Sequence, residues 1–153
     1  MATTFRSDVV AAIRTVLLAQ QAATPTQLRA VYTARPGAFP ETPCAYIGNR
    51  DETIRYGSSL RTRTMTGLTV VIVDRLIDAS ETTDRLDDLV DLLIDRFTAA
   101  YAAVTGGGSL VQLTSISDTD ITLTGEANSA TYRGCILGFG DPANPTFITE
   151  GRT

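Results

Sequence analysis

Residues 68–75 of the chain read LTVVIVDR, a run in which the apolar side chains from Val70 to Val73 leave neither face polar. β-branched residues favour extended backbone, and a strand without a polar face is typical of the centre of a sheet covered on both sides. We therefore expect a covered central strand here. Just upstream, residues 60–66 read LRTRTMT and alternate charged or apolar with hydroxyl side chains, as expected of a strand that has run beyond its own core. We interpret residues 50–67 as a projecting β-hairpin arm.

Downstream of this strand, residues 81–103 carry apolar side chains at helical spacing. At 100° per residue they fall within about 140°, the stripe width of a helix packed on one side. The stripe consists of Leu86, Leu89, Val90, Leu93, Ile94, Phe97 and Tyr101. The sequence TGGGS at 105–109 then ends the helix, and we interpret it as a flexible turn because its glycines follow a helix instead of opening one.

The remaining elements complete one α+β domain over residues 1–153. We expect a first helix over 8–22 capped by Ser7, a strand within 27–33, a proline-rich extended loop over 35–43 and a strand over 44–48. Three more strands are expected at 110–116, 120–124 and 132–139, and a flexible tail at about 140–153. The predicted main sheet is mixed or antiparallel, with four to five strands flanked by the two helices.

Missing residue types exclude much chemistry. The chain has no histidine, and all 13 of its cations are arginine, so His-activated nucleophiles, imidazole metal ligands, Walker lysines and Schiff-base lysines are excluded. Cys44 and Cys135 are 91 positions apart and form no CxxC motif, and we expect both to be buried as small apolar residues. We expect no enzyme activity, no cofactor and no resident metal. No signal peptide or stretch long enough to span a membrane is recognisable, which predicts assembly in the cytoplasm without a membrane partner.

The second helix also carries an acidic face opposite its apolar stripe. Three like-charged pairs at i,i+4 spacing cost the helix about 1 kcal/mol in total. We weighed three interpretations: a solvated face, a contact surface for a cationic partner, and a divalent metal site, which the outward-radiating side chains do not favour. The acidic face consists of Asp84, Asp87, Asp88, Asp91 and Asp95.

Charge is divided unequally along the chain: residues 1–75 carry a net charge of +4 and residues 76–153 a net charge of −8. The arm holds Arg50, Arg55, Arg61 and Arg63. A basic arm and an acidic face on one chain are complementary in a head-to-tail contact, which closes into a ring when the rotation permits. Binding of the arm to DNA phosphates is the rival interpretation, which the net negative charge of the whole chain disfavours.

A second acidic motif, Asp118-Thr119-Asp120, permits two interpretations. A pair of carboxylates at this spacing would serve a metal site or a metal-dependent enzyme. The motif lacks the later Asp, Gly and Glu of a calcium loop, and we interpret it as a turn before a strand.

Three segments together carry a resemblance to a known family: RTRTMT at 61–66, LTVVIVDR at 68–75 and DRLDDLVDLLIDR at 84–96. Their pattern resembles the tail terminator proteins of long-tailed phages with non-contractile tails, a group of small minor tail or tail-completion proteins. The similarity covers about residues 43–103, and the first helix and the late Tyr132-Arg133-Gly134 strand agree in order.

This resemblance implies a non-catalytic structural protein of the virion neck. Such a subunit forms a ring, usually a hexamer, on the last ring of major tail tube protein, stops tail growth and presents a surface to the head completion or connector protein. DNA passes through its lumen without sequence-specific binding. The alternatives are a head-tail stopper protein of the connector and a cytoplasmic module that binds a metal or a small molecule.

Overall fold

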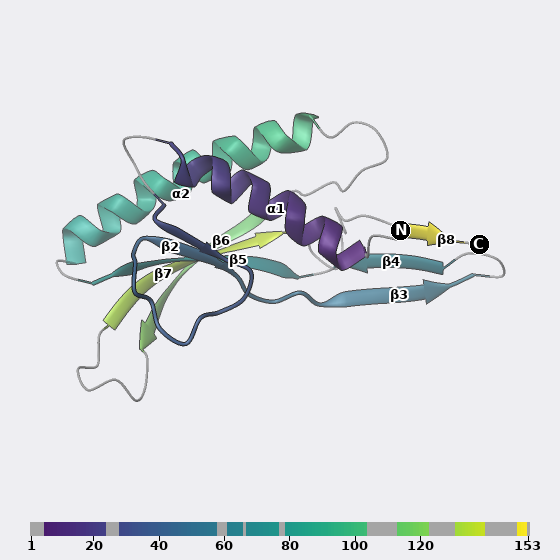
Figure 1. The fold of residues 1–153 in the computed structure, drawn as a ribbon, viewed down its shortest axis with the longest axis horizontal. Coiled ribbons are helices and arrows are strands. Elements are labelled where there is room, and N and C mark those ends of the chain that lie inside the picture. Colours follow the sequence, from purple (N-terminus) through teal and green to yellow (C-terminus); the bar gives the residue numbers. More distant parts are fainter. Residues whose placement is uncertain are drawn as a thin grey trace.

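In the computed structural model, the residues that the structure describes are 5–23, 28–57, 61–65, 67–76, 79–103, 113–122, 131–139 and 150–152. The predicted α+β class is confirmed by their order of helix, strands, helix and strands (Figure 1). In chain order the elements are α1 (Phe5–Gln21), β1 (Ala30–Tyr32), β2 (Cys44–Ile47), β3 (Glu52–Tyr56), β4 (Arg61–Met65), β5 (Leu68–Arg75), α2 (Ala79–Ala103), β6 (Leu113–Thr122), β7 (Thr131–Phe139) and β8 (Glu150–Arg152).

Five strands form the main sheet, in the order β1-β2-β5-β7-β6. β1 and β2 are parallel, and the other neighbouring pairs are antiparallel. The central position belongs to β5, in which Ile72 is paired with Ala45 of β2 on one side and with Cys135 of β7 on the other. The predicted mixed sheet of four to five strands, with a covered central strand at 68–75, is confirmed.

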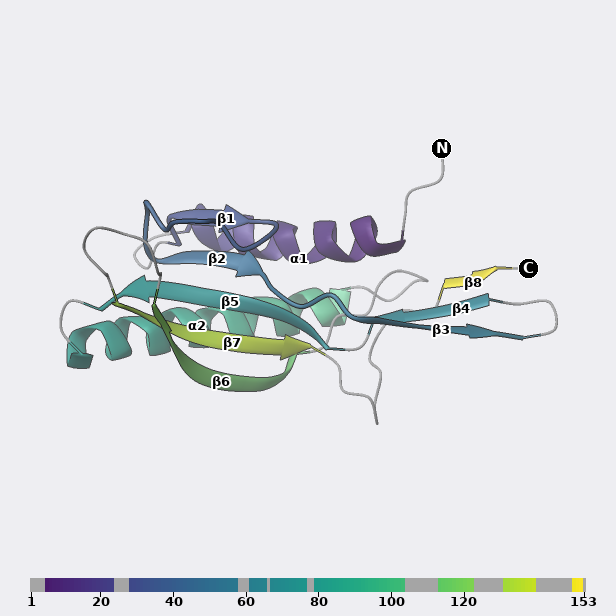
Figure 2. The same cartoon turned by 90° about the horizontal axis from the view of Figure 1, so that it is seen from below.

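Both helices lie on one face of the main sheet (Figures 1 and 2). Side chains of a β-strand alternate between faces, so every second residue of β5, starting from Leu68, meets the helices. Phe97 of α2 packs edge-to-face on Phe139 of β7, with ring centroids 4.9 Å apart. Each large side chain buried here contributes about 1.5–3 kcal/mol to folding. This core consists of Ile13, Leu17, Leu28, Ala45, Ile47, Leu68, Val70, Ile72, Leu86, Leu89, Val90, Leu93, Phe97, Cys135, Leu137 and Phe139.

The opposite face of the main sheet has a smaller core of its own. Val71 and Val73 point to this side of β5 and pack with residues of β2, β6 and β7. The cover comes from the proline-rich loop predicted at 35–43, which contributes the buried ring of Phe39. That ring stacks on Tyr46, with centroids 6.0 Å apart, and meets Tyr132 edge-on at 5.0 Å. The central strand is therefore covered on both faces, by helices on one and by a loop on the other.

A second sheet contains β3, β4 and β8, in the order β3-β4-β8. Both views place it beyond one end of the main sheet (Figures 1 and 2). The register pairs Arg63 of β4 with Ile54 of β3 and Arg61 with Tyr56. β8 pairs with β4 on the other side, through Glu150 opposite Arg63. The strands predicted for the arm are paired with each other, but as part of a three-stranded sheet, and the expectation of a projecting hairpin stays a prediction.

The passage from the main sheet to the second sheet is fixed by backbone and side-chain hydrogen bonds. The N–H of Gly48 donates to the carbonyl of Thr69 at 2.9 Å, and the N–H of Thr69 donates to the carbonyl of Asn49 at 3.1 Å. The N–H of Asn49 also donates to Oγ1 of Thr69 at 2.8 Å, and its Nδ2 donates to Oδ2 of Asp51 at 2.8 Å. On the returning chain, Gly67 has a φ of 88°, a left-handed conformation that glycine adopts without steric cost.

Several sequence-based boundaries need correction. α1 begins at Phe5, so Ser7 lies inside the helix and does not cap it. Instead of two strands at 110–116 and 120–124, the described residues form one strand, β6, so the turn predicted at Asp118–Asp120 is wrong. Asp, Thr and Ser suit turns, but they also suit an edge strand whose side chains meet solvent, and that context prevails here.

Two other predictions fall largely outside the described residues. The turn at 105–109 lies there entirely, as do residues 140–149 and 153 of the predicted flexible tail. Within the tail, the segment Glu150–Arg152 forms β8. The flexible tail itself stays a prediction.

Candidate functional site

The acidic face of α2 is the most extensive charged surface that the sequence predicted. Its five carboxylates, Asp84, Asp87, Asp88, Asp91 and Asp95, are all exposed. The helix places them there because the opposite side is taken up by the core residues Leu86, Leu89, Val90, Leu93 and Phe97. Within the described part of the chain, none of the five forms an ion pair with an arginine.

A polar cluster holds the N-terminal part of α2 on the main sheet and so orients the acidic face. The carboxylate of Asp74, only 1% exposed, accepts a hydrogen bond at Oδ2 from Nε of Arg85, 2.6 Å away. Its Oδ1 accepts the N–H of Arg75 at 2.9 Å. The buried Oγ1 of Thr82 donates to the carbonyl of Arg75 at 3.3 Å. The strand β7 is bonded to the same part of the helix, because Nη1 of Arg133 donates to Oγ1 of Thr83 at 3.1 Å.

Further along α2, another buried polar contact fixes α1 against it. Gln20 of α1 is 1% exposed, and its Oε1 accepts a hydrogen bond from Nε of Arg96 at 2.5 Å. A charge-assisted hydrogen bond in a buried setting is stronger than a neutral one, and it fixes the register between the two helices. The acidic face thus lies on a helix that is held at both ends of its packed length.

The arginines predicted for the arm are distributed over the start of the second sheet and its first two strands. Arg50 is exposed and precedes β3. Arg55 lies in β3 opposite Thr62, whereas Arg61 and Arg63 occupy alternate positions of β4. The register therefore brings Arg61 and Arg63 to one face of the second sheet and Arg55 to the other.

The acidic face and the arm lie on different parts of the subunit. α2 runs along the main sheet, and the second sheet lies beyond one end of it (Figures 1 and 2). Contact between these two surfaces, which the sequence predicted between neighbouring subunits, has no counterpart within one described chain. It stays a prediction.

Three exposed apolar side chains adjoin these charges and were missed in the sequence. Tyr56 of β3 is 79% exposed, Ile54 is 46% exposed, and Leu92 of α2 is 39% exposed. The two β3 residues share a face, a signal that the alternation at 54 and 56 already carried. Leu92 lies outside the apolar stripe of α2 and next to the acidic face. This position in the helical pattern could have predicted its exposure.

The acidic pair of β6 is also exposed. Asp118 lies opposite Cys135 of β7, and Asp120 lies opposite Arg133. Within the residues that the structure describes, no group of three or more Cys, Asp or Glu side chains is arranged to hold a metal ion. The motif is better described as the solvent-facing side of an edge strand, where charges prevent unwanted strand pairing.

Both thiols are free and buried, as the sequence predicted. Burial raises the pKa of Cys44 to about 12, with a further increase from Asp74. Burial also raises the pKa of Cys135 to about 11, helped by Asp118 and then by Asp87. Because the thiolate is the nucleophile and the metal ligand, neither group is activated for chemistry at neutral pH.

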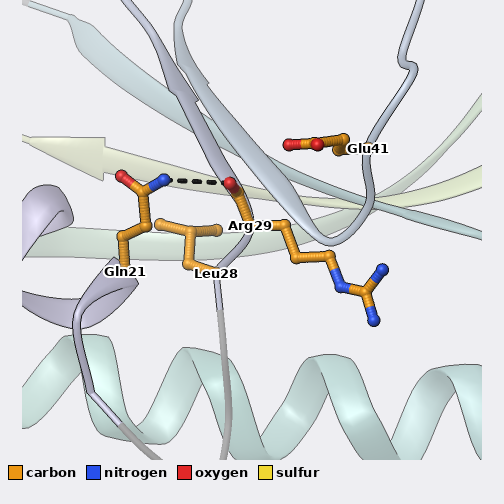
Figure 3. A pocket seen from close by; sticks show the side chains of 4 residues that line it. All are labelled: Gln21, Leu28, Arg29 and Glu41. Atoms are coloured by element: carbon orange, nitrogen blue, oxygen red, sulfur yellow. Dashed lines mark hydrogen bonds between the residues drawn. The ribbon is translucent and has the colours of Figure 1, made fainter.

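One surface hollow of about 320 Å³ lies between the end of α1 and the strand β1 (Figure 3). Its lining consists of Gln21, Leu28, Arg29 and Glu41. The Nε2 of Gln21 donates to the carbonyl of Arg29 at 2.9 Å, so the side-chain amide of Gln21 is already engaged within the protein. The guanidinium of Arg29 and the carboxylate of Glu41 do not converge on a common point (Figure 3). The hollow therefore lacks the converging polar groups of a ligand site.

No helix among the described residues is both long and apolar enough to cross a lipid bilayer. In comparisons with known proteins, no family model matches the chain, and no curated protein matches it in sequence.

Proposed function

We propose that this chain is a structural protein of the junction between the head and the tail of a long-tailed phage, where it forms a ring on the end of the tail tube. In that position it terminates tail growth and offers the surface to which the head attaches. Its work is assembly in the virion, with no catalysis and no cofactor. Its partners are further copies of itself, the tail tube protein and the head connector.

The observation that carries this proposal is the separation of two complementary surfaces on one subunit. The acidic face has no arginine partner in the described chain, and the arm lies beyond one end of the main sheet. Surfaces of opposite charge that do not meet within a subunit can form ion pairs when two copies of the chain bind each other. Such a contact is heterologous, and a heterologous contact produces a ring when its rotation closes.

The fold supports the phage assignment through its order of elements. The segment from β2 through the second sheet and β5 into α2 has the sequence that the resemblance to tail terminators rests on, and it folds as a strand, a strand pair, a buried strand and an amphipathic helix. The resemblance to tail terminators implies this same order of elements. An acidic lumen would also suit DNA passage, because it would offer no cations to replace the counterions of the phosphates.

Native mass spectrometry over a range of concentrations tests ring formation. We expect a hexamer near 98 kDa, six times the subunit mass of 16.3 kDa. The variant Arg61→Glu with Arg63→Glu is expected to stay monomeric while keeping the circular dichroism spectrum of the wild type. The matched control is Arg14→Glu with Arg35→Glu, which changes the net charge equally at exposed positions outside the arm. An intact ring in the arm variant would rule out this contact.

A second measurement tests termination itself. Tail tubes are polymerised from the major tail protein with and without the chain, and their lengths are measured by electron microscopy. We expect the added chain to cap tube ends and to stop elongation. Unchanged tube lengths together with tight binding to isolated head connectors would replace the terminator by the stopper protein, and no binding to either would reject the junction.

A further inference from the structure

We propose that the second sheet is a separate folding unit, which opens and closes in the free subunit while the main sheet and both helices stay folded. The unit consists of the strands β3, β4 and β8. This inference goes beyond the proposed function and does not depend on it. Its basis is the contrast between the two sheets in how their strands are covered.

The described side chains of β3 are exposed on both faces of the strand. Because side chains alternate along a strand, Thr53 lies on one face, and Ile54 and Tyr56 lie on the other. Thr53 is exposed, Ile54 is 46% exposed and Tyr56 is 79% exposed. In β5, by contrast, Val71 on one face and Ile72 on the other are both buried. Of the second-sheet residues whose side chains the structure describes, none belongs to either core.

Strand pairing gives the second sheet little stability of its own. β3 and β4 are each five residues long, and a two-stranded hairpin without a covered apolar face is marginally stable in water. β8 adds only three residues, with Gly151 at its centre, and glycine provides no side chain to pack. The register places Glu150 opposite Arg63, a pair of opposite charge, but it also places Arg152 opposite Arg61. Like charges directly opposite each other disfavour pairing, so the third strand stabilises the hairpin only weakly.

The main sheet keeps its core and its hydrogen bonds when the second sheet opens. The pairing of β2 with β5 ends at the junction, where the N–H of Gly48 donates to the carbonyl of Thr69 and the N–H of Thr69 donates to the carbonyl of Asn49. The second sheet lies beyond this point (Figure 2). Its opening therefore removes no described core side chain and neither of these bonds. Regions of this kind open locally, at a free energy far below that of global unfolding.

Such an equilibrium would control binding to the second sheet. A molecule that recognises the closed sheet would bind only the closed fraction of subunits. Its apparent affinity would fall in proportion to that fraction, and its binding would close the sheet.

Hydrogen exchange followed by mass spectrometry tests this inference on the full chain, diluted until native mass spectrometry shows the monomer. The comparison is between β4 and β5, because each is paired with a strand on both sides. Hydrogen bonding alone would therefore give their paired amides similar protection. We expect the amides of β4 to exchange at least about 100-fold faster, because β4 exchanges through local opening and β5 through global unfolding. Equal protection of the two strands would overturn the proposal.

Two matched proline variants give an independent readout. Thr62 in the middle of β4 and Ile72 in β5 are each paired with residues on both neighbouring strands, and proline removes a backbone donor from such a position. We expect Thr62→Pro to keep its urea midpoint, measured by circular dichroism, within about 0.25 M of the wild type. Ile72→Pro should abolish the cooperative transition. Loss of the transition in Thr62→Pro, or a midpoint that falls together with the protection of β5, would overturn the proposal, because the two sheets would then unfold as one unit.

Discussion

Replacing Arg85 by methionine tests how strongly the polar cluster at the start of α2 holds the helix on the main sheet. The substitution removes the cation and keeps most of the aliphatic length and the helix propensity of the side chain. It leaves the carboxylate of Asp74, which is 1% exposed, with the N–H of Arg75 as its remaining donor among those described here. The cost is thus the cost of a buried charge that has lost its partner.

The structure sets the size of this effect. Breaking a fully buried ion pair by removing one partner costs about 3–5 kcal/mol. The side chain of Arg85 is 41% exposed, so water enters its place and solvates part of the carboxylate. We therefore expect the free energy of unfolding to fall by about 2–3 kcal/mol, below the buried limit and well above the value of an exposed pair. In Asp74→Asn the charge is gone and an acceptor remains, and we expect a loss of about 1–2 kcal/mol.

Urea unfolding followed by circular dichroism measures these differences. With an m value of about 2 kcal/mol/M, the midpoint of Arg85→Met falls by about 1 M. The double variant with Asp74→Asn is expected to lose less than the sum of the single losses, because the amide needs no cation. Arg14→Met, at an exposed position of α1, serves as the control and should stay within about 0.5 kcal/mol of the wild type. A midpoint for Arg85→Met as high as that of this control would refute the reasoning.

Three further outcomes are expected. A Cβ at Gly138 would collide with Oγ of Ser115, so Gly138→Ala should lower the melting temperature, and adding Ser115→Ala should restore it, because the next contact, to Cβ of Ser115, is an ordinary 3.6 Å. Folding raises the pKa of Cys44 from 9.0 to about 12 and that of Cys135 from 9.0 to about 11. The contribution of the two thiols to the free energy of unfolding should therefore be constant below pH 9 and decline as the pH rises from 9 toward 12. Urea midpoints measured from pH 7 to 11 should decline less when both cysteines are replaced by alanine. Calorimetric titration with calcium should give no saturable heat, and heat that disappears when the two β6 aspartates become asparagine would instead favour a metal-binding module.

The sequence predicted best those elements whose pattern is local and repeated. The run of Val and Ile residues in β5 is apolar on both faces, which indicates a covered strand. The stripe on α2 repeats with the helical period, which indicates both the helix and the side that it buries. The acidic face followed for the same reason, since helix geometry alone places its aspartates opposite the core.

The errors arise where the pattern is ambiguous or the contact is distant in sequence. Asp118 and Asp120 belong to residue types that turns and exposed edge strands share, and only the pairing with β7 decides between them. β8 has no strand pattern of its own in the sequence EGR, and it forms by pairing with β4, almost ninety positions earlier. Tyr56 was missed because the alternation at Ile54 and Tyr56 indicates only that the two residues share a face, whereas the exposure of that face depends on packing that the sequence does not contain.

The junction at Asn49 and Gly67 has a consequence for symmetry. These two short connections set the direction in which the second sheet leaves the main sheet, and hydrogen bonds from Asn49 to Thr69 and Asp51 fix one of them. In a head-to-tail ring the same rotation recurs at every subunit, so an error of a few degrees at the junction accumulates around the circle. A stiffer or differently angled junction would change the number of subunits needed to close the ring, or would turn the closed ring into an open spiral.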